Sequence, residues 1–188
     1  MNILIVSGSR NPEGQTARAV SALVQGIGAA GGTCRQCFLP SMQIERCRQC
    51  ENNGWGLCRS EGRCIIEDDF SALVAQIRAA DAVVFATPVY YGDLSESLRA
   101  FLDRLRRTCT HDAGKAGITG KPAVGICVAG GGGGGGPSCT VSLEKVLRTC
   151  GFDVLDLVPV RRQNLPLKEE VLRITGKWLG ETLRREAG

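Results

Sequence analysis

Short apolar runs alternate with segments of helical periodicity along this chain, and this alternation constrains its fold more than any other feature. The first run, Asn2–Ser7, is almost unbroken in its hydrophobicity, which is typical of a strand buried on both faces of a parallel sheet. A loop rich in glycine and polar residues follows, and then Val20, Leu23, Val24 and Ile27 recur at helical spacing. Strand, loop and helix in this order open a βα unit.

The same rhythm recurs to the end of the chain. Four further strands are predicted at Thr33–Leu39, Ala82–Ala86, Ala123–Val128 and Phe152–Val158. Four further helices are predicted around Phe70–Ile77, Leu94–Leu105, Leu143–Cys150 and Leu167–Arg185. Gly151 is expected to end the helix before the last. Five strands and five helical segments predict a doubly wound α/β fold, a parallel sheet with helices on both faces.

Length and composition limit the function classes. The 188 residues fit one domain, 1–188, interrupted by a cysteine-rich insertion at about 41–67. The net charge is only +4, and the basic residues Arg104, Arg106 and Arg107 read as helix surface or anion attraction, so no nucleic-acid partner is expected. No apolar run is long enough to cross a bilayer and the first residues do not resemble a signal peptide, so we expect a cytoplasmic protein without a membrane partner.

The loop after the first predicted strand, Ser7–Thr16, has the composition of an anion site. Backbone N–H groups at the start of the next helix favour a phosphate or carboxylate. Ser9, Gln15 and Thr16 add side-chain donors, and Arg10 adds a positive charge. The segment is neither a Walker loop nor the three-glycine dinucleotide pattern. An ordinary loop with a capped helix is the alternative interpretation.

Two more loops of unusual composition follow the third and fourth predicted strands. Ligands of open α/β sheets bind beyond the carboxyl ends of strands, where these loops lie. Thr87–Asp93 holds a proline and two tyrosines, a flat apolar wall that suits a planar ring. Ala129–Ser138 contains seven consecutive glycines, which allow backbone to approach a ligand closely. Tyrosines packed within their loop and a flexible glycine linker are the alternatives.

Four of the ten cysteines lie in one polar loop, in the pattern Cys47-x2-Cys50-x7-Cys58-x5-Cys64. In a reducing compartment such a group is not read as a disulfide framework. Thiolates at this spacing suit a 4Fe-4S cluster or a closed zinc site. Redox-active or structural thiols without metal are the third possibility.

The remaining cysteines carry less information. Cys127 and Cys150 occupy positions of the apolar pattern and are expected to be small core residues. Cys34 and Cys37 are three residues apart on one predicted strand, so they are expected on opposite faces of the sheet.

Three segments together resemble a known family. Asn2–Thr16, Asp81–Arg104 and Lys121–Gly136 are similar to the flavodoxin-like NAD(P)H-dependent FMN reductase superfamily, and most of all to its iron–sulfur flavoprotein branch. Gly8-Ser9-Arg10 with Gln15-Thr16 resembles the family's phosphate loop, Ala86–Tyr90 resembles its isoalloxazine loop, and Cys64–Phe70 resembles a stretch common in that branch.

The resemblance implies a flavodoxin-like fold that binds FMN. The phosphate would lie at Ser9, Arg10, Gln15 and Thr16. The ring would lie against Pro88, Val89, Tyr90 and Tyr91, with backbone N–H groups from Thr87 onward at its polar edge and with Gly130, Gly131 and Gly132 closing the far side. The resemblance also implies a homodimer or homotetramer. The iron–sulfur branch has two residues between the second and third cysteines, whereas this chain has seven.

Three functions follow from these features. The first is an FMN-dependent oxidoreductase that takes electrons from NAD(P)H and passes them to a quinone, a flavin or another small acceptor. The lone loop histidine, His111, is not expected to act as an acid or base, because the flavin carries the chemistry. The second function is an electron carrier that uses FMN and a 4Fe-4S cluster with a redox protein as partner. The third is a nonredox interaction module stapled by zinc.

Overall fold

The computed structural model describes residues 1–51 and 53–186 and contains a five-stranded parallel sheet. Its strands are β1 (Asn2–Ser7), β2 (Thr33–Phe38), β3 (Ala82–Pro88), β4 (Pro122–Ala129) and β5 (Asp153–Arg161). They are ordered β2-β1-β3-β4-β5, and every neighbouring pair is parallel. This is the flavodoxin-like order, in which the direction of winding switches between β1 and β3. The predicted fold class is confirmed.

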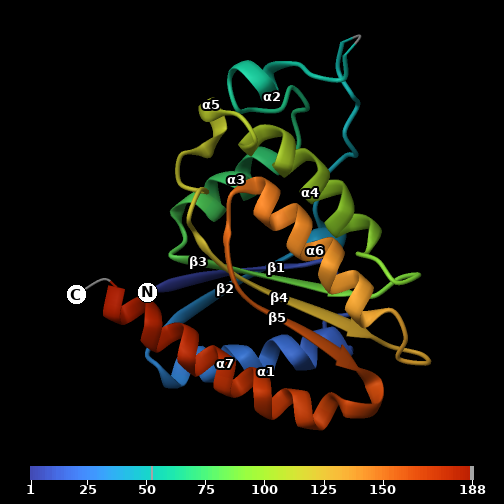
Figure 1. The fold of residues 1–188 in the computed structure, drawn as a ribbon, viewed down its shortest axis with the longest axis vertical. Helices are drawn as coiled ribbons and strands as arrows, with labels where there is room; N and C mark the ends of the chain where they lie inside the picture. The colour runs from blue at the N-terminus through green and yellow to red at the C-terminus, as the bar shows by residue number, and fades with distance from the viewer. Residues whose placement is uncertain (52, 187–188) are drawn as a thin grey trace.

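Helices cover both faces of the sheet (Figure 1). The helices are α1 (Gln15–Ala29), α2 (Leu57–Ser60), α3 (Phe70–Ala79), α4 (Glu96–Cys109), α5 (Asp112–Lys115), α6 (Gly136–Cys150) and α7 (Leu165–Glu186), with 3-10 turns η1 (Leu39–Ser41) and η2 (Arg162–Asn164). Helices α1 and α7 form one layer, and α3, α4 and α6 form the other. The short α2 and α5 lie beyond one end of α4. No described helix is both long and apolar enough to span a membrane.

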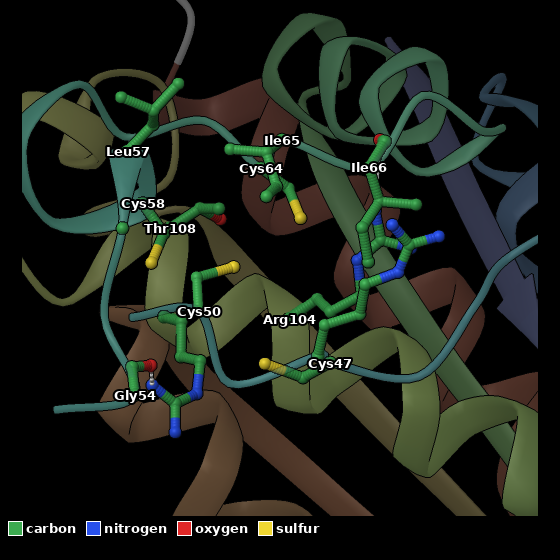
Figure 2. A pocket seen from close by; sticks show the side chains of 13 residues that line it. Cys47, Cys50, Gly54, Leu57, Cys58, Cys64, Ile65, Ile66, Arg104 and Thr108 are labelled. Carbon is green, nitrogen blue, oxygen red and sulfur yellow. Dashed lines mark hydrogen bonds between the residues drawn. The ribbon is translucent and has the colours of Figure 1, made fainter. Parts of the chain in front are cut away.

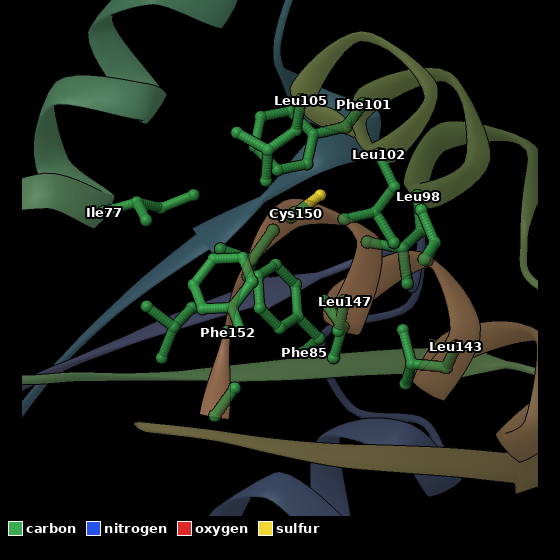
Figure 3. Packing of buried hydrophobic residues seen from close by; sticks show 14 of the residues in the cluster. Ile77, Phe85, Leu98, Phe101, Leu102, Leu105, Leu143, Leu147, Cys150 and Phe152 are labelled. Carbon is green, nitrogen blue, oxygen red and sulfur yellow. The ribbon is translucent and has the colours of Figure 1, made fainter. Parts of the chain in front are cut away.

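Each face of the sheet has its own hydrophobic core. Ile3 and Ile5 point toward α1 and α7, whereas the alternate residues Leu4 and Val6 point toward α3 and α4. On the second face, aromatic and leucine side chains interlock between β3 and the helices, as Figure 3 shows. The rings of Phe85 and Phe152 lie 5.4 Å apart in an edge-to-face arrangement.

Local predictions hold for the end of α6 and for Cys34, Cys37, Cys127 and Cys150. Gly151 ends α6 in the left-handed conformation, at φ 97°. Cys127 and Cys150 are buried, as expected. Cys34 packs against the α1–α7 core and Cys37 against the opposite one, so they do lie on different faces. Strand β5 begins one residue later than predicted and continues to Arg161.

Candidate functional site

The loop between β1 and α1 offers hydrogen-bond donors at the carboxyl end of the sheet. Helix α1 begins at Gln15, and no described side chain caps its first turn. Ser9 and Thr16 are buried beside this terminus, and the Ser9 hydroxyl donates to the Asn11 carbonyl at 3.3 Å. Because the first N–H groups of a helix lack intrahelical partners, they remain available to an anionic ligand.

Gln15 gives the strongest sign that this loop accommodates a ligand. Its Oε1 atom is buried and has no hydrogen-bond partner among the described residues. Leaving such a group unpaired costs about 1–3 kcal/mol. The amide can turn either its oxygen toward a hydroxyl or its nitrogen toward a phosphate, since the two orientations are interchangeable. Donors, an unpaired amide and the exposed Arg10 therefore fit the phosphate and sugar-alcohol end of FMN.

The second loop is held rigidly where it leaves β3. Thr87 is buried; its hydroxyl donates to the Pro88 carbonyl at 2.8 Å and accepts from the Ser95 N–H at 3.0 Å. The Val89 N–H donates to the Val128 carbonyl at 2.9 Å, which ties the loop to β4. These bonds fix the loop from both sides.

A tight turn follows at Tyr90–Asp93. These two residues exchange backbone hydrogen bonds of 3.0 and 2.9 Å. Between them, Tyr91 and Gly92 have positive φ angles of 51° and 78°, as in a type I′ turn. The side chain of Tyr91 projects fully into solvent, whereas Tyr90 is 43% exposed. The structure therefore separates two tyrosines that the sequence groups together.

The glycine run lies beside this turn. The Ser138 hydroxyl donates to the Gly92 carbonyl at 2.9 Å, so the start of α6 contacts the tyrosine loop. A Cβ atom added at Gly130, Gly131 or Gly132 would meet nothing within 4 Å. Packing does not require glycine at these three positions, but Gly131 has a positive φ of 40°, which favours glycine. The Gly130 carbonyl accepts from the Gly133 N–H and the Gly132 carbonyl from the Gln163 amide.

One open pocket connects the first two loops. It is lined by Gly8, Arg10, Pro40, Tyr90, Ser95, Glu96 and Ser97. Of the predicted site residues, only Arg10 and Tyr90 line this pocket. The lining does not include Ser9, Gln15, Thr16, Thr87, Pro88, Val89, Tyr91 or the glycines at 130–132. The sequence analysis missed Pro40 and the serines at the start of α4. A serine pair before an apolar helix is a capping pattern, and it is the signal that could have found them.

The four clustered cysteines line a second, smaller cavity. Cys47, Cys50, Cys58 and Cys64 are half-buried free thiols, and Figure 2 shows their sulfur atoms around a common space. Among residues 1–51 and 53–186, no three potential ligands stand close enough to form a ready metal site. The sulfur donors suit a metal or cluster, but the thiols would have to draw together to bind it.

Three arginines, Arg48, Arg104 and Arg107, also line this cavity. Two of them are ion-paired, Arg48 with Glu45 and Arg104 with Asp68. Arg104 was expected at the helix surface, and this interpretation is wrong: its side chain is only 1% exposed.

A buried ion pair holds the cysteine loop on α4. The Arg104 guanidinium donates to the Asp68 carboxylate at 2.6 Å and to the Glu45 carbonyl at 3.0 Å, and it lies 4.2 Å from the centre of the Phe70 ring. Asp68 also accepts from the Glu45 and Phe70 N–H groups. Burial acts to raise the pKa of Asp68, but these hydrogen bonds prevail and hold that pKa below its usual value. Both ends of the loop are thereby fixed to one buried arginine.

Gly54 and Trp55, which lie between Cys50 and Cys58, are held in place by Arg107 of α4. Arg107 donates to the Gly54 carbonyl at 2.6 Å, and its guanidinium lies 4.8 Å from the centre of the Trp55 ring. The His111 ring meets Trp55 edge-on, with centroids 5.0 Å apart. The histidine is thus engaged in packing beside the cysteine cavity.

The strand order, and the loops that follow the strands at the carboxyl end of the sheet, place this protein in the flavodoxin-like class. Residues 1–164 match the model of one family in this class, described as NADPH-dependent FMN reductase. This chain belongs to that family.

The comparisons also identify more specific relatives. An iron–sulfur flavoprotein of Methanocaldococcus jannaschii is 30% identical over 106 residues, which is 56% of this chain and 52% of that protein. An iron–sulfur flavoprotein of Methanosarcina thermophila is 29% identical over 104 residues, 55% of this chain and 52% of that protein. The chain therefore spans about half the length of the curated relatives it matches.

Solved structures agree on the fold. The NAD(P)H:quinone oxidoreductase from Methanothermobacter marburgensis superposes with a TM-score of 0.70 at 21% identity, covering 95% of this chain and 96% of that one. A WrbA-like flavodoxin from Agrobacterium tumefaciens gives 0.60 at 18% identity, with 98% of each chain covered. At such identities the likeness establishes the architecture.

Proposed function

We propose that this chain is an FMN-dependent oxidoreductase that takes electrons from NAD(P)H and passes them to a quinone, a flavin or another small acceptor. The observation that carries the proposal is the uncapped start of α1 with the unpaired Gln15 amide. Arg10, in the loop before this helix, lines one pocket together with Tyr90. Membership in the FMN reductase family supports it. Bound FMN would supply the redox chemistry, since a flavin exchanges electrons singly or in pairs.

The residues of the chain then bind and orient. Ser9, Gln15 and Thr16 hold the phosphate end together with the free N–H groups of α1, and Arg10 offsets its charge. Thr87 keeps the β3 loop in place through its bond to Ser95, so that the loop backbone meets the polar edge of the ring. Contacts of the ring with residues 88–91 and 130–132 remain predictions.

A charge introduced at Gln15 tests the phosphate assignment. Gln15→Glu preserves the side-chain shape but places a carboxylate where the phosphate is expected. We expect the Kd for FMN to rise at least about tenfold, or about 1.4 kcal/mol, while the Kd for riboflavin, which has no phosphate, stays within a small factor. Flavin fluorescence quenching in the flavin-free protein measures both constants.

Gln25→Glu is the matched control, because Gln25 lies on the same helix, in contact with Arg173 and remote from its N-terminus. It should bind FMN as the native chain does. If Gln15→Glu binds FMN as tightly as the native chain, the phosphate does not bind beside Gln15. If the native chain binds no flavin, the proposed function is wrong.

An iron–sulfur electron carrier is the second candidate. Four thiols around one cavity favour it, and so do the names of the curated relatives. Anaerobic purification followed by iron and sulfide analysis tests it, with stoichiometric iron and sulfide expected. A colourless protein that contains zinc would instead support the nonredox module. Steady oxidation of NAD(P)H with quinone favours the enzyme, whereas reduction only by a ferredoxin-type donor favours the carrier.

We further propose a single FMN-binding domain that acts in the cytoplasm as a homodimer or homotetramer. The ten free cysteines support a reducing compartment. Size-exclusion chromatography with light scattering measures the oligomeric state directly.

A further inference from the structure

Helix α6 packs on strand β4 in a register that one close contact fixes. The helix connects the parallel strands β4 and β5, so it runs back along β4 in the opposite direction (Figure 1). A Cβ atom added at Gly125 of β4 would lie 2.7 Å from the Cδ2 atom of Leu143 on α6. Leu143 therefore lies directly over Gly125, where a side chain would leave it no room.

The same register brings Cys139 of α6 over Cys127 of β4. Cys139 lies four residues before Leu143, about 6 Å along the helix. Cys127 lies two residues after Gly125, about 7 Å along the strand and on the same face. Both cysteine side chains are fully buried in one hydrophobic cluster with Leu143. Their thiols are free and are in hydrogen-bond contact with each other.

The two thiols differ in acidity. Cys139 lies in the first turn of α6, whose start no described side chain caps, and helix N-termini stabilise thiolates. The hydrogen bond from Cys127 lowers the pKa of Cys139 against the opposing effect of burial, whereas the same contact and burial raise the pKa of Cys127. Asp93 and Arg99, the charges that act on Cys139, form an ion pair with each other. Cys139 is therefore the thiol suited to attack an oxidant.

A second pair of buried cysteines lacks this difference. Cys109 and Cys150 are also buried, and Cys109 acts on the pKa of Cys150. Burial raises the pKa of both thiols. Each is the last residue of its helix, α4 or α6, where the helix dipole disfavours a thiolate. This pair has similar burial but no acidic member, so it serves as an internal comparison.

We propose that Cys127 and Cys139 form a redox-active dithiol that hydrogen peroxide oxidises to a disulfide. The Cys139 thiolate attacks one oxygen of the peroxide, the O–O bond breaks, and the hydroxide released takes up a proton to become water. Cys139 is then a sulfenic acid. The Cys127 sulfur attacks the Cys139 sulfur, the S–O bond breaks, and the second oxygen leaves as water with the Cys127 proton. Two thiols and one peroxide thus give one disulfide and two water molecules.

The disulfide would close the glycine run into a covalent loop. Residues 128–138 lie between the two cysteines and include every glycine of the run. A disulfide places its sulfur atoms about 2 Å apart, and the glycines before α6 allow its first turn to make this approach. Both sulfurs are buried, so peroxide reaches them when the run opens. Opening is favoured because a Cβ atom would meet nothing within 4 Å at four of its positions, Gly130, Gly131, Gly132 and Gly134.

Peptide mapping of the purified holoprotein after treatment with millimolar peroxide tests the proposal, and it does not depend on flavin binding. Trypsin leaves Cys127 and Cys139 in one peptide, residues 116–145, because Pro122 protects the bond after Lys121. That peptide should lose two hydrogen atoms and should no longer take up an alkylating reagent after denaturation. Dithiothreitol should restore both alkylation sites. The loss should be at least about ten times faster than any loss at Cys109 or Cys150, which lie in other peptides.

Cys127→Ala separates disulfide formation from simple oxidation. Without its partner, Cys139 should gain oxygen as a sulfenic or sulfinic acid, and the peptide should not lose hydrogen. Cys150→Ala is the matched control, since it also shortens a buried cysteine but should form the disulfide as the native protein does.

Three results would each overturn the proposal. The first is a native peptide 116–145 that keeps both alkylation sites after peroxide treatment. The second is oxidation of this peptide no faster than that of Cys109 and Cys150. The third is loss of two hydrogen atoms from the same peptide in Cys127→Ala. The first two measurements need only the native protein, so the test stands even if circular dichroism shows that a variant does not fold.

Discussion

Replacing Asp68 with asparagine tests the anchor that fixes the cysteine loop to α4. The side chains of Asp68 and Arg104 are 6% and 1% exposed and meet at 2.6 Å. The Glu45 N–H donates to Oδ2 of Asp68 and the Phe70 N–H to Oδ1, so asparagine keeps an oxygen for only one of them, and it removes the charge that compensates the guanidinium. Loss of one partner from a buried pair costs about 3–5 kcal/mol. Because asparagine retains some hydrogen bonds, we expect a value near the lower end, about 3 kcal/mol.

Thermal unfolding followed by circular dichroism measures this loss. For a chain of this length, each kcal/mol lowers Tm by about 2–4 °C, so a decrease of about 6–12 °C is expected. Asp103→Asn is the matched control on the same helix, since Asp103 and Arg106 form a surface pair that is 38% and 37% exposed. Surface pairs contribute less than about 1 kcal/mol, so its Tm should barely change.

A second measurement links the anchor to the loop. If Asp68→Asn loosens both ends of the loop, the four cavity thiols should react faster with a disulfide reagent than in Asp103→Asn. An Asp68→Asn protein whose Tm falls no further than that of the control would refute the reasoning. Unchanged thiol reactivity would show that the pair stabilises the fold without holding the loop.

Three more outcomes are expected. Gly176→Ala should lower the free energy of unfolding by about 1–3 kcal/mol in urea titration, because its methyl group collides with the backbone of α1. Gly28→Ala, where a Cβ would meet nothing, should raise the free energy of unfolding by up to about 1 kcal/mol. Equal effects of the two variants would contradict the close packing of α7 on α1. Thr87→Val should lower the free energy of unfolding by about 1–3 kcal/mol and weaken FMN binding in fluorescence titration, because the buried Ser95 N–H loses its acceptor. An unchanged stability and FMN affinity would contradict the role of Thr87 in holding the loop after β3. The pKa of Asp68 is lower in the folded protein than in the unfolded chain, so its stabilisation is complete above the unfolded pKa and is lost as pH falls through the folded value. The Tm difference between the native chain and Asp68→Asn should therefore shrink below about pH 4, and a constant difference would contradict the charge effect.

The sequence predicts most of the fold because the relevant patterns are local. A strand buried on both faces must be apolar throughout, and β1 begins and ends where Asn2–Ser7 predicts. Alternation along β2 places Cys34 and Cys37 on opposite faces, as the backbone pleat requires. The loops of the candidate FMN site follow from this order, since each comes directly after a strand.

Long-range pairing is less visible in the sequence. The exposure of Tyr91 depends on the backbone turn at Tyr90–Asp93, which the residue pattern does not reveal. The pocket beside Arg10 includes Pro40 and Ser95 because separate segments meet there.

By itself, the sequence determined a flavodoxin-like sheet, a loop of hydrogen-bond donors after β1 and a four-cysteine loop. Only the tertiary structure decided that Arg104, which reads as a surface residue of an amphipathic helix, is buried against Asp68, 36 residues away. The periodicity of a helix reports which face is apolar, but it does not report which distant carboxylate will pair with a charge on that face. For that reason the cysteine loop could be found in the sequence, whereas the buried ion pair that anchors it could be found only in the fold.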